Sequence, residues 1–108
     1  MITSSEFIKG YTEIIILAIL SKNDAYLYEI TRTIKTVSDG QITISNPSVF
    51  TMLKHLVEEG KIEIYQDEEH VKSNKKMYRL TEYGKLVLSK QRVEYIASLY
   101  HLIALINQ

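Results

Sequence analysis

The sequence predicts a mainly helical fold with one small β-hairpin. One observation is the segment 46–62, which combines a helix-start signal, apolar residues at helical spacing and a glycine where a helix would end. Another is the pair of short stretches 61–66 and 75–80, in which apolar and polar residues alternate. With 108 residues the chain is long enough for one domain with a modest core.

Two helices and a short strand are expected before this segment. Residues 5–21 are expected to form the first helix, whose second half is apolar nearly all round. Residues 27–37 repeat apolar side chains at helical spacing and are followed by Ser38-Asp39-Gly40, which predicts a second helix that ends there. In residues 41–45 isoleucines alternate with polar residues, which predicts a short strand.

The third helix is predicted from its two ends and its apolar stripe. Asn46 is a preferred N-cap residue, and Pro47 fits the first helical position because its missing N–H has no partner there. Gly60 follows at a place where glycine ends helices in the left-handed conformation. The apolar stripe consists of Val49, Leu53, Leu56 and Val57. The opposite face is polar and partly cationic, and it carries Ser48, Thr51, Lys54 and His55.

The hairpin and a long last helix complete the chain. Residues 67–74 are polar throughout and are expected to connect the two strands, and Thr81 is expected to cap the helix that follows. The resulting order of elements is helix, helix, strand, helix, strand, strand, helix. This is the order of a winged helix-turn-helix with an appended C-terminal helix, in which the hairpin is the β-wing.

Two apolar surfaces exceed what a single chain of this size can cover, and they lie in residues 14–20 and 93–106. We therefore expect the first and last helices of one subunit to pack against those of another in a two-fold homodimer. The alternative is a helix buried within its own domain, but little sequence remains to cover it. The expected interface residues are Tyr11, Ile15, Ala18, Ile96, Leu99, Leu102, Ile103 and Ile106. The chain is thus divided into a winged helix-turn-helix domain, residues 1–80, and a dimerisation helix, residues 81–108.

Composition argues against several classes of protein. Thirteen basic and thirteen acidic side chains cancel, so nucleic-acid binding cannot follow from bulk charge and depends on local placement. No cysteine is present, which removes disulfides and thiolate metal sites and fits a reducing cytoplasm. The longest apolar run is far shorter than the roughly twenty residues of a membrane span. We find no catalytic motif, metal-ligand spacing or cofactor-binding loop, and we expect neither an enzyme nor a cofactor.

Lysines gather on the predicted hairpin. Lys72, Lys75 and Lys76 could reach DNA phosphates beside the groove that the third helix would occupy. The alternative is a solvated hairpin tip, in which the acidic residues 67–69 simply pair with these lysines.

With these motifs in view, the chain resembles the PadR family of bacterial transcriptional regulators over nearly its whole length. The resemblance is carried by Tyr28-Glu29-Ile30, Ser48-Val49-Phe50, Glu59-Gly60-Lys61-Ile62 and Tyr78-Arg79-Leu80-Thr81-Glu82-Tyr83-Gly84. It implies a cytoplasmic, dimeric, DNA-binding repressor that contacts a palindromic operator through its third helix and its wing. Together with the polar helix face and the hairpin lysines, it implies the DNA-binding residues Tyr28, Ser48, Phe50, Thr51, Lys54, His55, Lys72, Lys75 and Lys76.

Two residues depart from the family pattern. The family usually has tyrosine at the position of Phe50 and a basic residue, commonly arginine, at the position of His55. The first change loses a hydroxyl, and the second replaces a permanent cation by a titratable one, so both are expected to weaken contacts with the DNA backbone. Together with the zero net charge they leave an alternative, a protein-interaction module that keeps the fold without binding DNA.

The resemblance also implies a ligand site at the centre of the dimer, where relatives bind flat aromatic or phenolic compounds and drugs. By that analogy the pocket residues are Phe7, Ile14, Leu17, Tyr95 and Leu99. The alternative is plain interface packing, since aromatic residues supply large contact areas at most interfaces.

Overall fold

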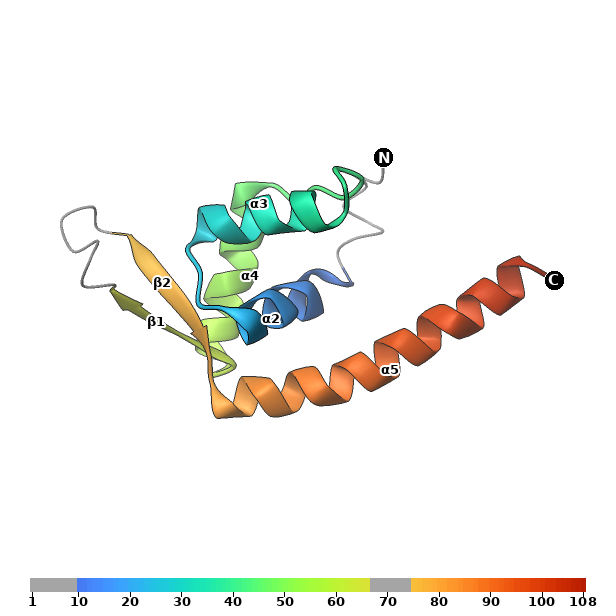
Figure 1. Cartoon of the computed structure of the whole chain (residues 1–108). Coiled ribbons are helices and arrows are strands. Elements are labelled where there is room, and N and C mark those ends of the chain that lie inside the picture. The colour runs from blue at the N-terminus through green and yellow to red at the C-terminus, as the bar shows by residue number, and fades with distance from the viewer. Residues whose placement is uncertain (1–9, 67–74) are drawn as a thin grey trace.

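The structure is a computed structural model that describes residues 10–66 and 75–108 of the chain. Its elements are α2 (Thr12–Lys22), α3 (Leu27–Val37), α4 (Asn46–Glu58), β1 (Ile62–Gln66), β2 (Lys76–Leu80) and α5 (Glu82–Ile106). Helices α2, α3 and α4 pack together, the hairpin projects from one end of this group, and α5 runs alongside α2 and beyond it (Figure 1). The predicted mainly helical fold with a small wing is confirmed.

The start of the first helix differs from the prediction. Gly10 and Tyr11 lie in a turn and α2 begins at Thr12, so a continuous helix over residues 5–21 is wrong at its N-terminal end. Residues 5–9 of that expected helix lie outside the described part of the chain.

The strand predicted over residues 41–45 is also wrong, since the structure assigns to this segment only a single bridging residue, Ile42. The Ser38 hydroxyl accepts a hydrogen bond from the N–H of Ile42 at 3.0 Å. The same hydroxyl lies within donating distance, 3.1 Å, of the carbonyl oxygen of Ile42. The place beside the hairpin is instead taken by Ala25, which exchanges both backbone hydrogen bonds with Tyr78 at 3.2 and 2.9 Å.

The N-cap of helix α4 lies one residue earlier than predicted, whereas the helix ends as predicted. Ser45, rather than Asn46, is the N-cap, since its hydroxyl accepts the N–H of Ser48 at 3.3 Å. Pro47 is therefore at the second helical position. At the other end Gly60 has φ of +75°, and the N–H of Lys61 returns to the carbonyl of Leu56 at 3.0 Å, the pattern of a Schellman motif.

The core lies between α2, α3, α4 and the base of the hairpin. Its largest fully buried side chains are Ile16, Leu17, Ile30, Leu53, Leu56, Ile62 and Val49. They come from several elements, so each helix buries one apolar face against the others. Val37 at the end of α3 continues the helical spacing but is exposed, because the helix has by then passed the edge of the core.

The wing is a two-stranded antiparallel hairpin in which Ile62 pairs with Leu80 and Ile64 with Tyr78. Tyr65 ties the hairpin to the α2–α3 connection, because its hydroxyl donates to the carboxylate of Asp24. This contact holds the strands at one angle relative to the helices.

Lys61, between α4 and β1, is the residue at which three elements meet. The backbone N–H of Thr81 donates to the Lys61 carbonyl at 3.1 Å. The single hydroxyl proton of Thr81 is shared between the carbonyls of Gly60, at 2.7 Å, and Lys61, at 3.0 Å. The same hydroxyl accepts the N–H of Gly84 at 3.0 Å, so Thr81 caps α5 as predicted. The Lys61 ammonium lies 3.3 Å from the carboxylate of Glu13 on α2 and 3.0 Å from that of Glu59 after α4.

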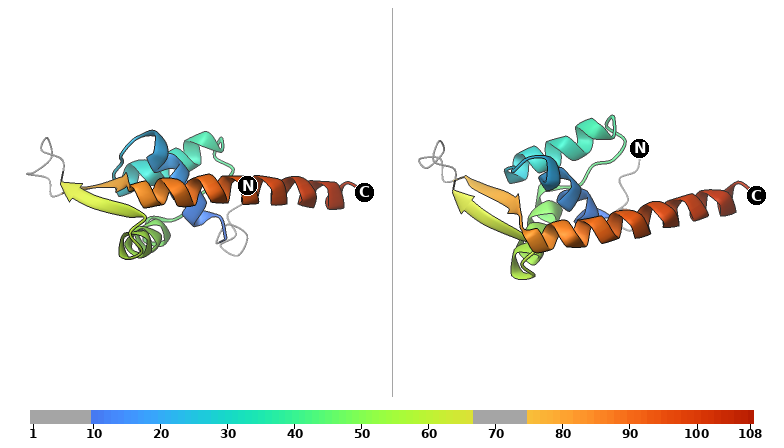
Figure 2. Two further views of the ribbon diagram at one scale, coloured as in Figure 1. Left: turned by 90° about the horizontal axis from the view of Figure 1, so that it is seen from below. Right: turned by 60° about the horizontal axis from the view of Figure 1, so that its bottom comes forward.

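Helix α5 divides into a packed half and a free half. With 25 residues it is about 37 Å long at 1.5 Å per residue. Its beginning packs against α2 and the hairpin, whereas its end projects past the rest of the molecule (Figure 2). The radius of gyration is 14.9 Å, above the roughly 13 Å expected for a compact chain of this length.

Gly84 is a position where a side chain cannot be accommodated. A Cβ atom there would lie 2.0 Å from the carbonyl oxygen of Lys61, which is held by Thr81 and cannot give way. We expect Gly84→Ala to lower the free energy of unfolding by about 1–3 kcal/mol, as measured by urea denaturation. Gly10→Ala is the control, because nothing lies within 4 Å of the added methyl group. Equal midpoints for Gly84→Ala and the wild type would contradict this packing.

The Lys61 ion pairs should make stability depend on pH. The hydrogen bond from Lys61 lowers the pKa of Glu59 below its ordinary value of 4.5. The contribution of the Glu59 carboxylate to the free energy of unfolding is therefore present above pH 4.5 and is lost as the pH falls through the lowered pKa. Burial opposes the charge of Lys61, but hydrogen bonds to Glu59 and Glu13 outweigh it and raise the pKa.

We therefore expect the wild type to lose more stability than Lys61→Met between about pH 5 and pH 3, as measured by urea denaturation. Lys85→Met is the control, since its ion pair with Glu82 is a solvent-exposed one. This expectation is contradicted if the free energies of unfolding of Lys61→Met and of the wild type change equally with pH over this range.

Candidate nucleic-acid interface

Helix α4 presents a polar face to solvent. Its buried face contains Val49, Leu53 and Leu56. The four side chains expected on the opposite face, Ser48, Thr51, Lys54 and His55, are all exposed. Phe50 lies beside this face and is half exposed, which is unusual for a phenylalanine that only fills a core. The period of 3.6 residues thus separates packing residues from residues able to contact a partner.

His55 at the end of this face has an acidic neighbour. Its Nε2 atom lies 3.2 Å from Oε1 of Glu59, and the same oxygen is 3.0 Å from the ammonium of Lys61. Donor atoms of Glu13, His55 and Glu59 come within 4.8 Å of one another, close enough for metal ligands. However, the Lys61 ammonium lies against both carboxylates, so an internal cation already offsets one of their two negative charges.

Sequence reasoning missed this charged cluster. The spacing of four residues between His55 and Glu59 could have been read from the sequence, because such residues are neighbours on a helix. The approach of Glu13 could not, since it depends on how α2 packs against the end of α4.

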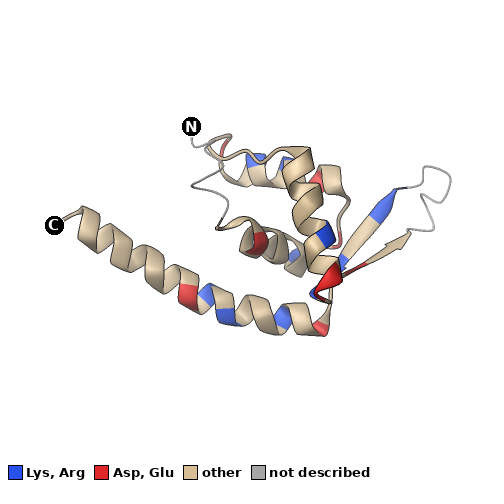
Figure 3. Ribbon diagram, turned by 180° about the vertical axis from the view of Figure 1, so that it is seen from behind, with Lys and Arg blue, Asp and Glu red and all other residues tan. Residues whose placement is uncertain are grey.

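The wing carries exposed cations at the start of β2. Lys75 and Lys76 are exposed, and the Lys75 ammonium lies 5.4 Å from the ring centre of Tyr26, at the beginning of α3. Basic residues mark the start of β2 and acidic residues the end of α4 (Figure 3). Lys72 and the acidic residues 67–69 lie outside the described part of the chain.

Arg79 and Tyr28 are also at the surface near these cations. Arg79 pairs with Glu63 at 2.8 Å and lies over the ring of Tyr65, so its charge is engaged within the wing. Tyr28 at the start of α3 is exposed, and the guanidinium of Arg32 lies 5.0 Å from its ring centre. The sequence analysis did not identify Arg32.

A hollow of about 260 Å³ lies between α2 and α5, and it is lined by Gly10, Tyr11, Tyr95 and Ser98. The rings of Tyr11 and Tyr95 meet edge to face with centres 5.6 Å apart, and the Tyr95 hydroxyl donates to the carbonyl of Gly10 at 3.0 Å. Of the expected pocket residues Tyr95 is part of this lining, and Phe7 lies outside the described residues. Ile14, Leu17 and Leu99 are not part of it, and Leu17 is fully buried in the core.

The free half of α5 carries an exposed apolar stripe. The residues expected at the interface on this helix, Ile96, Leu99, Leu102, Ile103 and Ile106, are between 41% and 78% exposed. Those expected nearer the N-terminus, Tyr11 just before α2 and Ile15 and Ala18 on it, are half-buried. Within the described ranges, none of the helices is long and apolar enough to cross a membrane.

Comparison with known proteins supplies a family. Residues 16–90 match the model of the transcriptional regulator PadR-like family. The chain is 33% identical over 83 residues to the transcriptional regulator YqjI of Escherichia coli K12, an alignment that covers 77% of this chain and 38% of YqjI. This chain therefore spans well under half the length of that relative.

Solved structures of similar proteins share the whole architecture. A transcriptional regulator from Clostridium thermocellum superposes with a TM-score of 0.82 at 28% identity, covering 94% of this chain and 95% of the other. A PadR-like transcriptional regulator from Bacillus cereus also has a TM-score of 0.82, at 23% identity, with 96% and 99% covered, and shares the fold. The family match extends from α2 through α4 and the wing into α5. The chain therefore belongs to the PadR-like family of transcriptional regulators.

Proposed function

We propose that the protein is a homodimeric repressor that inserts α4 of each subunit into successive major grooves of a palindromic operator. The observation that carries this proposal is the exposed polar face of α4 in a chain of this regulator family. A helix fits the major groove, which is about 12 Å wide, and two-fold related helices meet half-sites about 34 Å apart.

The contacts fall into two classes. Ser48, Thr51, Lys54 and His55 face the groove, with Phe50 packed beside the sugar-phosphate backbone. Tyr28 and the wing lysines, Lys72, Lys75 and Lys76, hold phosphates on either side and carry no base specificity themselves. The Thr51 hydroxyl donates to the carbonyl of Pro47 at 2.9 Å, so Thr51 can contact a base as an acceptor or through its methyl group, and as a donor only by giving up this local bond.

Local charge supports DNA binding despite the zero net charge. Beside the end of α4, Lys61 offsets one of the two carboxylate charges of Glu59 and Glu13, and on the wing Glu63 is neutralised by Arg79. Among the described residues, Lys54, Lys75 and Lys76 are in no ion pair and are exposed on α4 and the wing. Cations that do not pair internally are the ones that can displace counterions from DNA.

The dimer would form through residues 81–108, the helix α5 with its flanking residues, together with α2. The apolar stripe on the free half of α5 has nothing in the described chain to cover it. A second copy supplies an identical stripe, which suits the self-complementary contact of a two-fold interface. A repressor of this kind would act in the cytoplasm, where it meets the chromosome.

The hollow between Tyr11 and Tyr95 is the proposed place for a small aromatic or phenolic effector. Its volume of about 260 Å³ is slightly below the range of roughly 300–1,000 Å³ usual for ligand pockets, and the second subunit would close it further. Two tyrosine rings offer stacking surfaces, and the Tyr95 hydroxyl offers a polar contact. Such a ligand would release the repressor from DNA.

DNA binding should weaken steeply with salt and depend on the wing. The logarithm of the affinity falls by about 0.9 per phosphate contact per tenfold rise in salt, so Lys75→Ala/Lys76→Ala should bind every duplex more weakly and flatten this slope by about 2. Binding curves with a random duplex at several salt concentrations measure both quantities. Lys85→Ala/Lys90→Ala removes the same charge from the exposed side of α5 and should leave binding nearly unchanged.

If the wing variant binds as the wild type does, the wing has been wrongly assigned. If the wild type itself does not bind duplex DNA at low salt, the alternative of a protein-interaction module stands in its place. That alternative is favoured by Phe50 and His55, the two departures from the family pattern.

The dimer should depend on the apolar stripe of α5. Leu99→Asp or Leu102→Asp would bury an unpaired carboxylate in an apolar interface and should raise the dissociation constant about 100-fold or more. Sedimentation at micromolar concentration measures the effect. His101→Asp places the same charge on an exposed polar position between them and should remain dimeric. A wild-type chain that sediments as a folded monomer would refute this interface.

A further inference from the structure

We propose that Glu13 is a positioning residue that couples the α2–α5 junction, where Tyr11 and Tyr95 meet, to the last turn of α4. Its carboxylate contacts residues from two other parts of the fold, Lys61 after α4 and Gln91 on α5. A change in the position of α2 relative to α5 is therefore transmitted to the helix that would contact DNA. In that respect the inference rests on the proposed function.

A continuous set of polar contacts leads from Glu13 to the polar face of α4. The Lys61 ammonium is 3.3 and 3.4 Å from the two carboxylate oxygens of Glu13. It is also 3.0 Å from Glu59, which in turn is 3.2 Å from Nε2 of His55. The last link reaches one of the residues exposed on that face.

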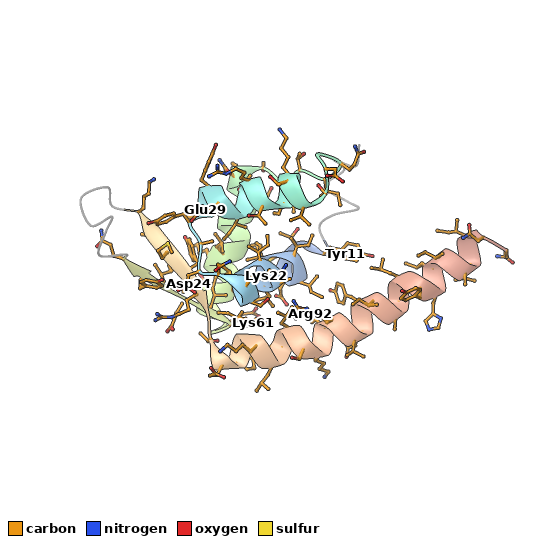
Figure 4. The ribbon with its side chains drawn as sticks, viewed as in Figure 1. Tyr11, Lys22, Asp24, Glu29, Lys61 and Arg92 are labelled. Carbon is orange, nitrogen blue, oxygen red and sulfur yellow. The ribbon has the colours of Figure 1, made fainter. Side chains whose placement is uncertain are left out.

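On the other side, Glu13 is connected to the junction of the two tyrosines. The side-chain amide of Gln91 donates to Oε2 of Glu13, while its own Oε1 is buried with no hydrogen-bond partner in the described structure. Gln91 precedes Tyr95 by one turn of α5, and Tyr11 precedes Glu13 by two residues on α2. In Figure 4, Lys61 lies beside the beginning of α5, and Tyr11, at the start of α2, lies beside a later part of α5.

Burial makes these contacts different from surface ion pairs. The side chains of Lys61 and Glu13 are only 13% and 21% exposed, whereas those of Lys85 and Glu82 on the surface of α5 are 58% and 90% exposed. A partly buried charge that loses its partner cannot simply exchange it for water. Movement of α2 must therefore either carry the cluster along or break it.

The Lys61 backbone cannot follow such a movement. Its carbonyl is held by Thr81 and packed against Gly84, and its N–H is bonded to Leu56. Displacement of Glu13 consequently acts on the Lys61 side chain, and through it on Glu59 at the end of α4. Hydrogen bonds and ion pairs that join packed elements are a physical route for such coupling.

A double-mutant cycle tests the coupling without requiring DNA. Tyr95→Ala loosens the tyrosine junction, and Glu13→Gln removes one of the two carboxylate charges that Lys61 contacts while keeping the side chain's size. The readout is hydrogen exchange at the amides of Glu59 and Lys61, which close the last turn of α4 by bonding to the carbonyls of His55 and Leu56. We expect Tyr95→Ala to speed exchange about fivefold in the Glu13 background and less than about twofold in the Glu13→Gln background.

The matched control background is Glu94→Gln, an exposed carboxylate on the same helix as Tyr95, in which the full fivefold effect should persist. If Glu13→Gln does not fold, Gln91→Met, which removes the amide donor to Glu13 while keeping a side chain of similar length, replaces it in the cycle. Equal acceleration by Tyr95→Ala with and without the Glu13 contact would overturn the inference.

Duplex binding by the same four proteins separates this inference from the proposed function. A non-additive effect on exchange in proteins that do not bind DNA upholds the coupling and refutes the repressor. Tight binding by the wild type with strictly additive exchange effects refutes the coupling and leaves the repressor in place.

Discussion

The rest of the structure depends on the hydrogen bonds made by the backbone N–H and carbonyl of Lys61. Its N–H closes the Schellman motif that ends α4, and its carbonyl receives the N–H and the hydroxyl of Thr81. Because β1 starts at the next residue and α5 starts after Thr81, the backbone groups of one residue set how the polar helix, the wing and the long helix are oriented. Gly84 is required because no side chain fits between α5 and this carbonyl.

The charged side chain of the same residue adds specificity rather than bulk stability. A partly buried ammonium is costly to desolvate, and an apolar side chain could fill its place at similar stability. What an apolar residue could not do is select one arrangement of Glu13 and Glu59, which belong to different parts of the fold. The ion pairs therefore define how α2 lies against the end of α4, and the wider apolar core supplies the driving force.

Local signals explain which parts of the fold could be predicted. The left-handed Gly60, the Thr81 cap and the apolar stripe of α4 are set by residues within a few positions, and all are present in the structure. The strand expected over residues 41–45 is absent, the Ser38 hydroxyl bonds to the backbone of Ile42 there, and Ala25 took the place beside the hairpin. The exposed polar face of α4 was likewise predictable from helical periodicity, whereas the cluster around Lys61 required tertiary packing that no local pattern contains.

The same distinction explains how a chain with zero net charge can expose unpaired lysines on α4 and the wing. Glu63 on the wing is paired with Arg79, and Lys61 offsets one of the two charges of Glu59 and Glu13 beside the end of α4. Lysines that are not drawn into pairs remain exposed, so the local field differs from the average that composition reports. Because pairing depends on the fold, DNA binding in such a chain is a property of its tertiary structure, and a loss of the Lys61 contacts would change the charge beside α4 as well as its geometry.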